Sequence, residues 1–229
     1  DDVIDIILKQ RQCAEFICRK IYTYFVNPSI DASHLNELTD LFYKDYNIEK
    51  LMRHIFMSDW FYEENNIGVK IKSPVELIVG IQKTVPSVFN NQRQVSYLQR
   101  MMGQILLYPV NVAGWKGGRY WIDSNSLMFR LKLPSDLLNN ANISFMTKGE
   151  FEDDFSDFYN QKSQNFKVSD QARAYFETHY AKITKGELKA ILLLPKLDHD
   201  TKEMLNIYQH QNAYQYCIQL MSIPEYQLC

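Results

Sequence analysis

The sequence has no excess of either charge and no long apolar run. Its 229 residues include 25 basic and 27 acidic side chains, a formal net charge of −2. A protein that binds nucleic acid through phosphates needs clustered Lys and Arg, and the sequence has no long basic run. The apolar run from Ile191 to Leu194 is far shorter than the ~20 residues that cross a bilayer. We therefore expect no nucleic-acid partner and no membrane span in this chain.

Cysteine and histidine are few and show no metal-ligand spacing. Cys13, Cys18, Cys217 and Cys229 form no Cys-x-x-Cys pair, and the five histidines are scattered. Structural zinc sites use closely spaced ligand pairs, so we expect no metal and no cofactor. A spacing of five on an expected helix turns Cys13 and Cys18 apart, which argues against a mutual disulfide. We expect the thiols to act as small buried apolar groups.

A catalytic signature is also missing. Hydrolysis typically needs a pair of carboxylates, a nucleophile with its base, or a metal ion. Asp123 is a lone acid in the stretch richest in glycine and tryptophan, and we expect the adjacent Ser124 to cap a helix. The sequence therefore leaves open whether the protein is an enzyme.

The residues that are abundant indicate a helical core. Hydrophobic residues make up 46% and aromatic residues 14% of the chain, enough for a sizeable core, and the apolar positions recur at helical spacing. The clearest local signal is Ser73-Pro74-Val75-Glu76, a capping box with proline at the first helical position. It predicts a helix from Ser73 to about Val85.

Other segments extend this helical pattern. Helices are predicted with Ser33 and Asn47 as N-caps, over residues 92–106, over 124–138 with a kink or division at Pro134, after a capping box at Thr184 to Glu187, and through Ala213, Cys217 and Leu220. Residues 166–183 fit helix or strand equally. We predict a mostly α fold, an irregular multi-helix array forming one domain over residues 1–229. An acidic insertion or loop at about residues 139–169, irregular or β, interrupts it.

Two short stretches resemble each other. In Ile55 to Phe61 and in Leu220 to Tyr226, a predicted helix ends at a serine that is followed by an acidic and an aromatic residue. We expect the aromatic side chain to fold back and close the helix end. The likeness is too short to establish a duplication.

The stretch of residues 109–130 concentrates glycine and tryptophan. Gly117 and Gly118 permit a tight turn with positive φ, and Gly114 permits close approach of the backbone to an indole. Such a loop can present aromatic rings and polar edges to a sugar or an extended peptide. The predicted ligand or partner surface comprises Trp115, Arg119, Tyr120, Trp121, Asp123 and Arg130. The alternative is that both tryptophans fill a gap between helices and Arg130 ties the loop to the next helix.

A second candidate site is a basic pair beside a helix start. Lys70 and Lys72 precede the capping box, where free backbone N–H groups can hold an anion. In the alternative interpretation Glu76 is occupied by the capping box and the lysines are solvated.

Several ordered motifs resemble the bacterial domain-of-unknown-function family 1800. They are Phe16 to Val26, Ser58-Asp-Trp-Phe61, Lys70 to Gly80, Gly114-Trp115 with Trp121 and Arg130, and Ser222 to Gln227. The resemblance implies a mainly helical protein whose members are about twice this long, so the chain is similar to the C-terminal portion of one. It also implies export, hence an extracytoplasmic location in the periplasm or at the cell surface. The implied partner is a sulfatase-like exported protein of domain-of-unknown-function family 1501. No activity and no catalytic residue come with the resemblance.

Together these features favour a non-catalytic binding or assembly module of an exported bacterial protein, with a glycan or the sulfatase-like protein as its partner. The alternative is part of a hydrolase acting on envelope polysaccharide. Its reactive groups would lie partly in an N-terminal portion that precedes this chain.

Overall fold

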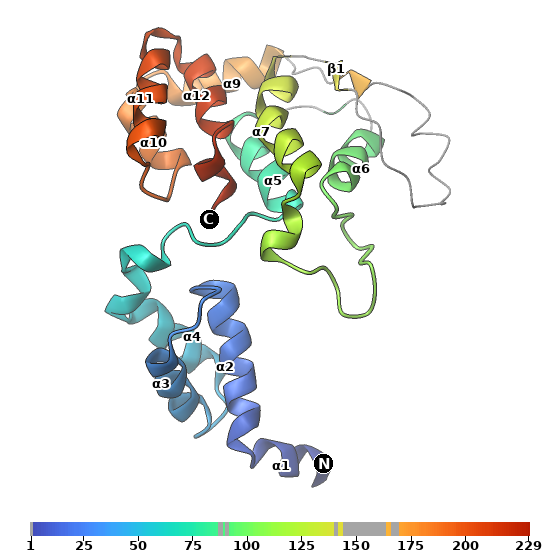
Figure 1. Cartoon of the computed structure of the whole chain (residues 1–229), viewed down its shortest axis with the longest axis vertical. Helices are drawn as coiled ribbons and strands as arrows, with labels where there is room; N and C mark the ends of the chain where they lie inside the picture. Colours follow the sequence, from blue (N-terminus) through green and yellow to red (C-terminus); the bar gives the residue numbers. More distant parts are fainter. Residues whose placement is uncertain (1, 87–88, 90–91, 140–141, 144–163, 166–169) are drawn as a thin grey trace. The chain divides into compact units, whose positions relative to one another are not determined.

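The computed structural model describes residues 2–86, 89, 92–139, 142–143, 164–165 and 170–229 (Figure 1). Contacts divide the chain into two compact units, Asp1–Lys70 and Ile71–Cys229, called here the N-terminal and the C-terminal unit. The mostly α fold is confirmed, because helices dominate both units. Compact units do not by themselves show independent folding, so the single domain over residues 1–229 stays a prediction. Within the described ranges, no helix combines the length and the apolar content needed to cross a membrane.

The N-terminal unit is built from helices. Its elements are α1 (Asp2–Leu8), α2 (Arg11–Phe25), α3 (Ala32–Phe42), α4 (Ile48–Met57) and the 3-10 helices η1 (Asp59–Tyr62) and η2 (Glu64–Asn66). Asn47 caps α4 as predicted, but the predicted cap Ser33 is wrong. The carboxylate of Asp31 accepts hydrogen bonds from the backbone N–H groups of Ser33 and His34, so α3 begins one residue before Ser33. An acidic cap two residues upstream satisfies the same orphan donors.

The C-terminal unit contains the remaining elements. They are α5 (Pro74–Thr84), α6 (Gln92–Met101), η3 (Gly118–Trp121), α7 (Ser124–Leu138), β1 (Asn142–Ile143), β2 (Gln164–Asn165), α9 (Asp170–Tyr180), α10 (Lys185–Leu192), α11 (His199–Ile207), η4 (Tyr208–His210), α12 (Ala213–Met221) and η5 (Pro224–Gln227). Strands β1 and β2 pair antiparallel with Asn142 opposite Asn165. The acidic residues of the insertion predicted at about residues 139–169 lie outside the described residues.

Helix α5 begins as the sequence predicts. The Ser73 hydroxyl accepts from the Glu76 N–H at 3.3 Å, and the Glu76 carboxylate accepts from the Ser73 N–H at 2.6 Å. Both capping boxes, this one and Thr184 with Glu187 at the start of α10, are therefore confirmed. The ambiguous segment 166–183 contains α9, a helix.

Helix α7 differs from its prediction at its start. Asp123 rather than Ser124 is the N-cap, because its carboxylate accepts from the N–H groups of Asn125 and Ser126. The helix is continuous through Pro134, which excludes the predicted division, and the alternative of a kink stays a prediction. Pro134 is buried, so packing against the core offsets the backbone hydrogen bond that proline cannot donate.

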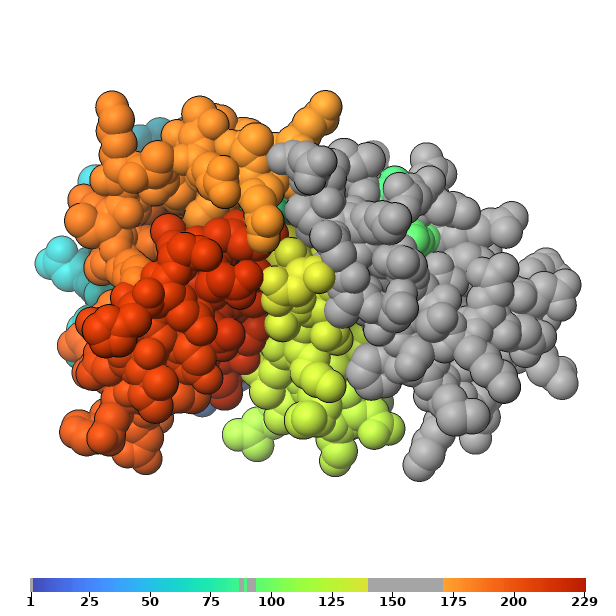
Figure 2. All heavy atoms as spheres, turned by 90° about the horizontal axis from the view of Figure 1, so that it is seen from above, coloured from blue at the N-terminus to red at the C-terminus, as the bar shows by residue number. Residues whose placement is uncertain are grey.

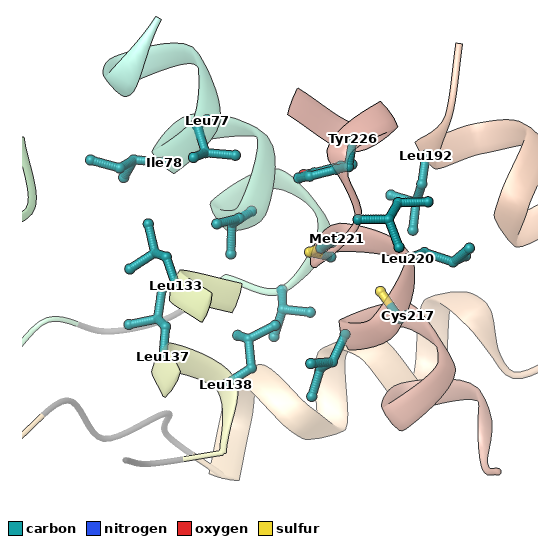
Figure 3. Close-up of a cluster of buried hydrophobic side chains, with 14 of the residues drawn as sticks. Leu77, Ile78, Leu133, Leu137, Leu138, Leu192, Cys217, Leu220, Met221 and Tyr226 are labelled. Carbon is teal, nitrogen blue, oxygen red and sulfur yellow. The ribbon is translucent and has the colours of Figure 1, made fainter. Parts of the chain in front are cut away.

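The core of the C-terminal unit lies between α5, α7 and the C-terminal helices. Figure 3 shows Leu77 of α5 facing Leu133 of α7, with Leu220 and Met221 of α12 beside them. Figure 2 shows the C-terminal helices, in red, flanked by α9 in orange and by α7 in yellow-green. Because α12 is packed on several sides, it buries apolar residues around most of its circumference.

The two similar stretches have similar structures. The Ser58 hydroxyl donates to the His54 carbonyl at 2.7 Å, and the Ser222 hydroxyl donates to the Ile218 carbonyl at 2.8 Å. A 3-10 helix follows each serine. In the first stretch Trp60 stacks on His34 of α3, with ring centroids 4.3 Å apart, so its ring packs against another helix. Closure of the helix end by the aromatic residue stays a prediction.

Burial should make two of the four thiols unreactive. Cys18 and Cys217 are fully buried, and burial raises the pKa of Cys18 to about 11 and that of Cys217 to about 12. Cys13 and Cys229 are partly exposed. We expect iodoacetamide at pH 8 to alkylate Cys13 and Cys229 at least about 100-fold faster than the buried pair, as measured by peptide mass spectrometry, because the thiolate is the reactive form. Equal rates at all four thiols would contradict this packing.

The same shifts predict a direction for stability at alkaline pH. Since the folded pKa of each buried thiol lies above its unfolded value near 9, the unfolded chain loses these protons first. The free energy of unfolding should therefore fall as the pH rises above about 9.

Candidate functional site

A long connection joins α6 to α7, and its first end is anchored to the helices (Figure 1). Gly103 has φ +85°. The N–H of Gly103 donates to the carbonyl of Arg100, and that of Gln104 donates to the carbonyl of Gln99, both at 2.9 Å. This Schellman motif ends α6 at Met101, so the predicted extension to residue 106 is wrong. The buried Gln104 side chain accepts from the N–H of Val75 at 3.1 Å, which ties the connection to the start of α5.

The second end is anchored under α7. Gly118 takes φ +66°, as the predicted tight turn requires, and begins η3. This short helix ends at Trp121, which is buried, and the Ser126 hydroxyl donates to the Trp121 carbonyl at 3.1 Å. Asp123 caps α7, and the N–H groups of Ser126 and Asn125 lower the pKa of its carboxyl. Trp121 and Asp123 therefore hold the end of the connection in place.

Between these anchors, residues 105–112 form what we call the apolar arm. Its large apolar side chains are mostly in water: Leu106, Leu107, Tyr108, Val110 and Val112 are all exposed. Leu107 also has φ +66°, a left-handed conformation that costs a non-glycine residue on the order of 1 kcal/mol. Leu107 thus combines an unfavourable backbone conformation with an exposed apolar side chain, and stability alone favours neither.

Residues 113–120 form the Gly/Trp turn. Trp115 is half-buried and lines a hollow of about 80 Å³ with Tyr108 and Val110 of the apolar arm. Tyr120 is exposed, and the Lys116 ammonium lies 4.9 Å from its ring centroid. Gly114 takes φ +84°, which suits a turn residue, and close approach of its backbone to the indole stays a prediction.

The predicted aromatic surface is thus split between two environments. Trp115, Arg119 and Tyr120 lie in the turn, with Arg119 and Tyr120 exposed, whereas Trp121 lies in the core. Among the described residues no ring contact joins the two indoles of the connection. The gap-filling alternative therefore fits Trp121, and the surface interpretation fits Trp115.

Arg130 belongs to a different part of the unit. It is fully buried; its Nε donates to Gln227 Oε1 at 3.1 Å and its Nη2 donates to the Lys72 carbonyl at 2.5 Å. Burial lowers the pKa of the guanidinium to about 10. Arg130 therefore ties the entry to α5 and the C-terminal segment to α7. Both hydrogen bonds go to these segments rather than to the Gly/Trp turn.

The two lysines of the predicted anion site have separate surroundings. The Lys70 ammonium lies 4.2 Å from the ring centroid of Tyr24 and belongs to the N-terminal unit. In the C-terminal unit, the Lys72 ammonium donates to the Tyr226 carbonyl at 2.7 Å and lies over the Tyr226 ring. Burial lowers the pKa of Lys72. Glu76 is occupied by its capping box, but the description of Lys72 as solvated is wrong. An anion site at this pair stays a prediction.

One protein family matches nearly the whole chain. Its sequence model covers residues 1–228 and is described as "Protein of unknown function (DUF1800)". The chain belongs to this family. No curated protein and no solved structure matches the chain. The predicted resemblance is confirmed, and it assigns no activity.

The structure shows why distant DUF1800 motifs occur together in this chain. Lys72, Arg130 and Gln227 come from three of the motifs that carried the resemblance, and they meet at one buried joint. The Lys72 N–H also donates to the Gln227 carbonyl at 2.8 Å. These three motif residues thus hold segments of the C-terminal unit together, whereas the Gly114-Trp115 motif lies in the exposed connection.

The C-terminal unit of this DUF1800 chain also has a hollow larger than the one beside Trp115, and no sequence motif predicts it. It measures about 370 Å³, lies between α9 and α12, and has aromatic walls of Phe176, Tyr180 and Tyr214 with Arg173 and Glu177 at its edge. That volume falls in the range of small-ligand pockets. Its residues lie about 40 positions apart in the sequence, so no local motif signals it.

Proposed function

We propose that the chain is a non-catalytic binding or assembly module of an exported bacterial protein, with the Gly/Trp turn as its partner surface. One observation supports this most directly: the connection is anchored at both ends by buried groups, yet it leaves Arg119 and Tyr120 in water. A rigid exposed aromatic costs little entropy to bind, which is why such side chains dominate binding surfaces.

The chemistry of the turn favours a partner with both flat apolar and polar groups. Half-buried Trp115 and exposed Tyr120 offer ring faces, and Lys116 and Arg119 supply donors but no acceptors. Sugars and extended polypeptides combine such features. The proposed partners are therefore a glycan or a sulfatase-like exported protein of domain-of-unknown-function family 1501, and the proposed location is the periplasm or the cell surface.

A matched pair of variants tests this function. We expect Trp115→Ala to weaken binding to a glycan array, or to a purified family 1501 protein, at least about tenfold, because the loss of an aromatic anchor typically costs more than 1.4 kcal/mol. Tyr175→Ala removes a part-exposed ring on α9 and serves as the control. If Trp115→Ala and the native chain gave identical profiles on both probes, the turn would have no part in binding.

A further inference from the structure

The apolar arm exposes more apolar surface than fold stability explains. Leu107 is 89% exposed and Val112 is fully exposed, while Leu106, Tyr108 and Val110 are each more than half exposed. Scattered apolar residues on a surface need no explanation, but a contiguous apolar segment marks a site of contact.

The direction of these side chains indicates what kind of contact it is. The Tyr108 N–H donates to the Ile105 carbonyl and closes a turn, with Leu106 and Leu107 as its two corner residues. Both corner side chains are exposed, so two apolar side chains project together at the tip of this turn. An apolar tip of this kind can enter a fluid apolar phase, which surrounds it on all sides.

Several backbone N–H groups in and beside the arm are already hydrogen-bonded within the protein. The N–H of Leu106 donates to the Gln99 side chain at 2.7 Å, that of Tyr108 donates to the Ile105 carbonyl at 3.0 Å, and Pro109 has no N–H. Just beyond the arm, the N–H groups of Ala113 and Gly114 both donate to Asn111. Because unpaired backbone groups oppose entry into lipid, these internal bonds lower the cost of insertion.

Charge favours an anionic surface. Between Glu76 and Asp123 the sequence contains no acidic residue and five basic ones, Lys83, Arg93, Arg100, Lys116 and Arg119, although the whole chain carries a net charge of −2. Lys116 and Arg119 follow the arm directly. Apolar tips beside aromatic and basic residues match the acyl, interfacial and phosphate levels of a bilayer.

We propose that the apolar arm inserts into the surface of a bilayer containing anionic lipid and holds the protein there without spanning it. Leu106, Leu107 and Val112 enter the acyl boundary, Tyr108 and Trp115 lie at the interface, and Lys116 with Arg119 contact lipid phosphates. The inference rests on the proposed role of the connection as an exposed binding surface. It does not depend on which partner the Gly/Trp turn recognises.

Flotation of the full chain with vesicles tests the proposal. The native chain should float with vesicles of phosphatidylcholine mixed equally with phosphatidylglycerol and bind pure phosphatidylcholine more weakly. Leu106→Ser/Leu107→Ser/Val112→Ser should reduce partitioning at least about tenfold on both. Lys116→Gln/Arg119→Gln should reduce it about tenfold on the anionic vesicles alone, and added salt should mimic this change.

The matched control replaces exposed apolar residues elsewhere. Met57→Ser/Ile207→Ser changes side chains that are 78% and 72% exposed, and it should float like the native chain. A second measurement needs no arm variant: bromine-labelled lipid should quench tryptophan fluorescence in the native chain, and Trp115→Phe should abolish most of that quenching.

The outcomes are separable from those of the proposed function. Failure of the native chain to float with either vesicle, or equal flotation of the native and triple-serine chains, would overturn the membrane proposal. A negative glycan and protein panel together with arm-dependent flotation would instead reject the proposed partners and retain the membrane contact.

Discussion

Arg130→Ala is expected to lower the free energy of unfolding by about 3 kcal/mol. The substitution removes a fully buried guanidinium, leaves a cavity, and strips partners from Gln227 Oε1 and the Lys72 carbonyl. Removing one partner of a buried charged hydrogen-bond set typically costs about 3–5 kcal/mol. Urea denaturation followed by helical circular dichroism measures the loss.

Two companion variants identify the cause of that loss. Arg130→Met keeps most of the volume and removes a desolvated charge, so it should cost less than Arg130→Ala. Arg119→Ala, at an exposed position, should change stability by less than about 0.5 kcal/mol. An Arg130→Ala effect as small as that of Arg119→Ala would show that the joint does not hold the unit together.

Trp121→Ala should also cost about 3 kcal/mol, for a different reason. Trp121 is buried at the end of η3, and its loss removes a large apolar side chain and leaves a void beneath α7. Urea denaturation measures this change as well. We expect Trp115→Ala to cost about 1 kcal/mol, because that indole is only half-buried.

The comparison separates the two interpretations of the tryptophan pair. If both indoles filled the core, both substitutions would destabilise the protein equally and neither would act on binding alone. The structure instead predicts that Trp121→Ala destabilises the protein more than Trp115→Ala does. Trp121 supports the fold, and Trp115 is available to a partner. Tyr120→Ala, at an exposed neighbour, is the control and should leave stability nearly unchanged.

Local signals in the sequence predicted the helix starts well. The capping boxes at Ser73 and Thr184 are formed as predicted, because each depends only on residues within one helical turn. The errors at Ser33 and Ser124 are of the same local kind. In both cases an aspartate one or two residues before the predicted cap accepts the hydrogen bonds instead. Helix α6 ends before the predicted residue 106 because Gly103, at φ +85°, closes it with a Schellman motif.

The candidate site depends on contacts that sequence spacing does not reveal. Arg130 was expected beside the Gly/Trp turn because it follows it in the chain, yet it binds residues 58 positions earlier and 97 positions later. Likewise, composition does not distinguish buried Trp121 from half-buried Trp115. The hydrogen bond from Ser126 and the turn at Gly118 hold Trp121 at the start of α7.

Exposure of the apolar arm could not be read from the sequence either. The sequence predicts a helix that continues to Leu106. Because the Schellman motif at Gly103 ends α6 earlier, Leu106 and the apolar residues after it lie in the connection and face water. This early helix end leaves the surface on which the membrane proposal rests.

Amide hydrogen exchange of the α6–α7 connection, measured by NMR, tests most directly whether it is an ordered surface. The structure predicts that the N–H groups of Leu106, Tyr108, Ala113 and Gly114 exchange at least about tenfold more slowly than in an unstructured peptide, because each is hydrogen-bonded within the connection or to α6. Exchange at unstructured rates throughout residues 105–114 would contradict the account.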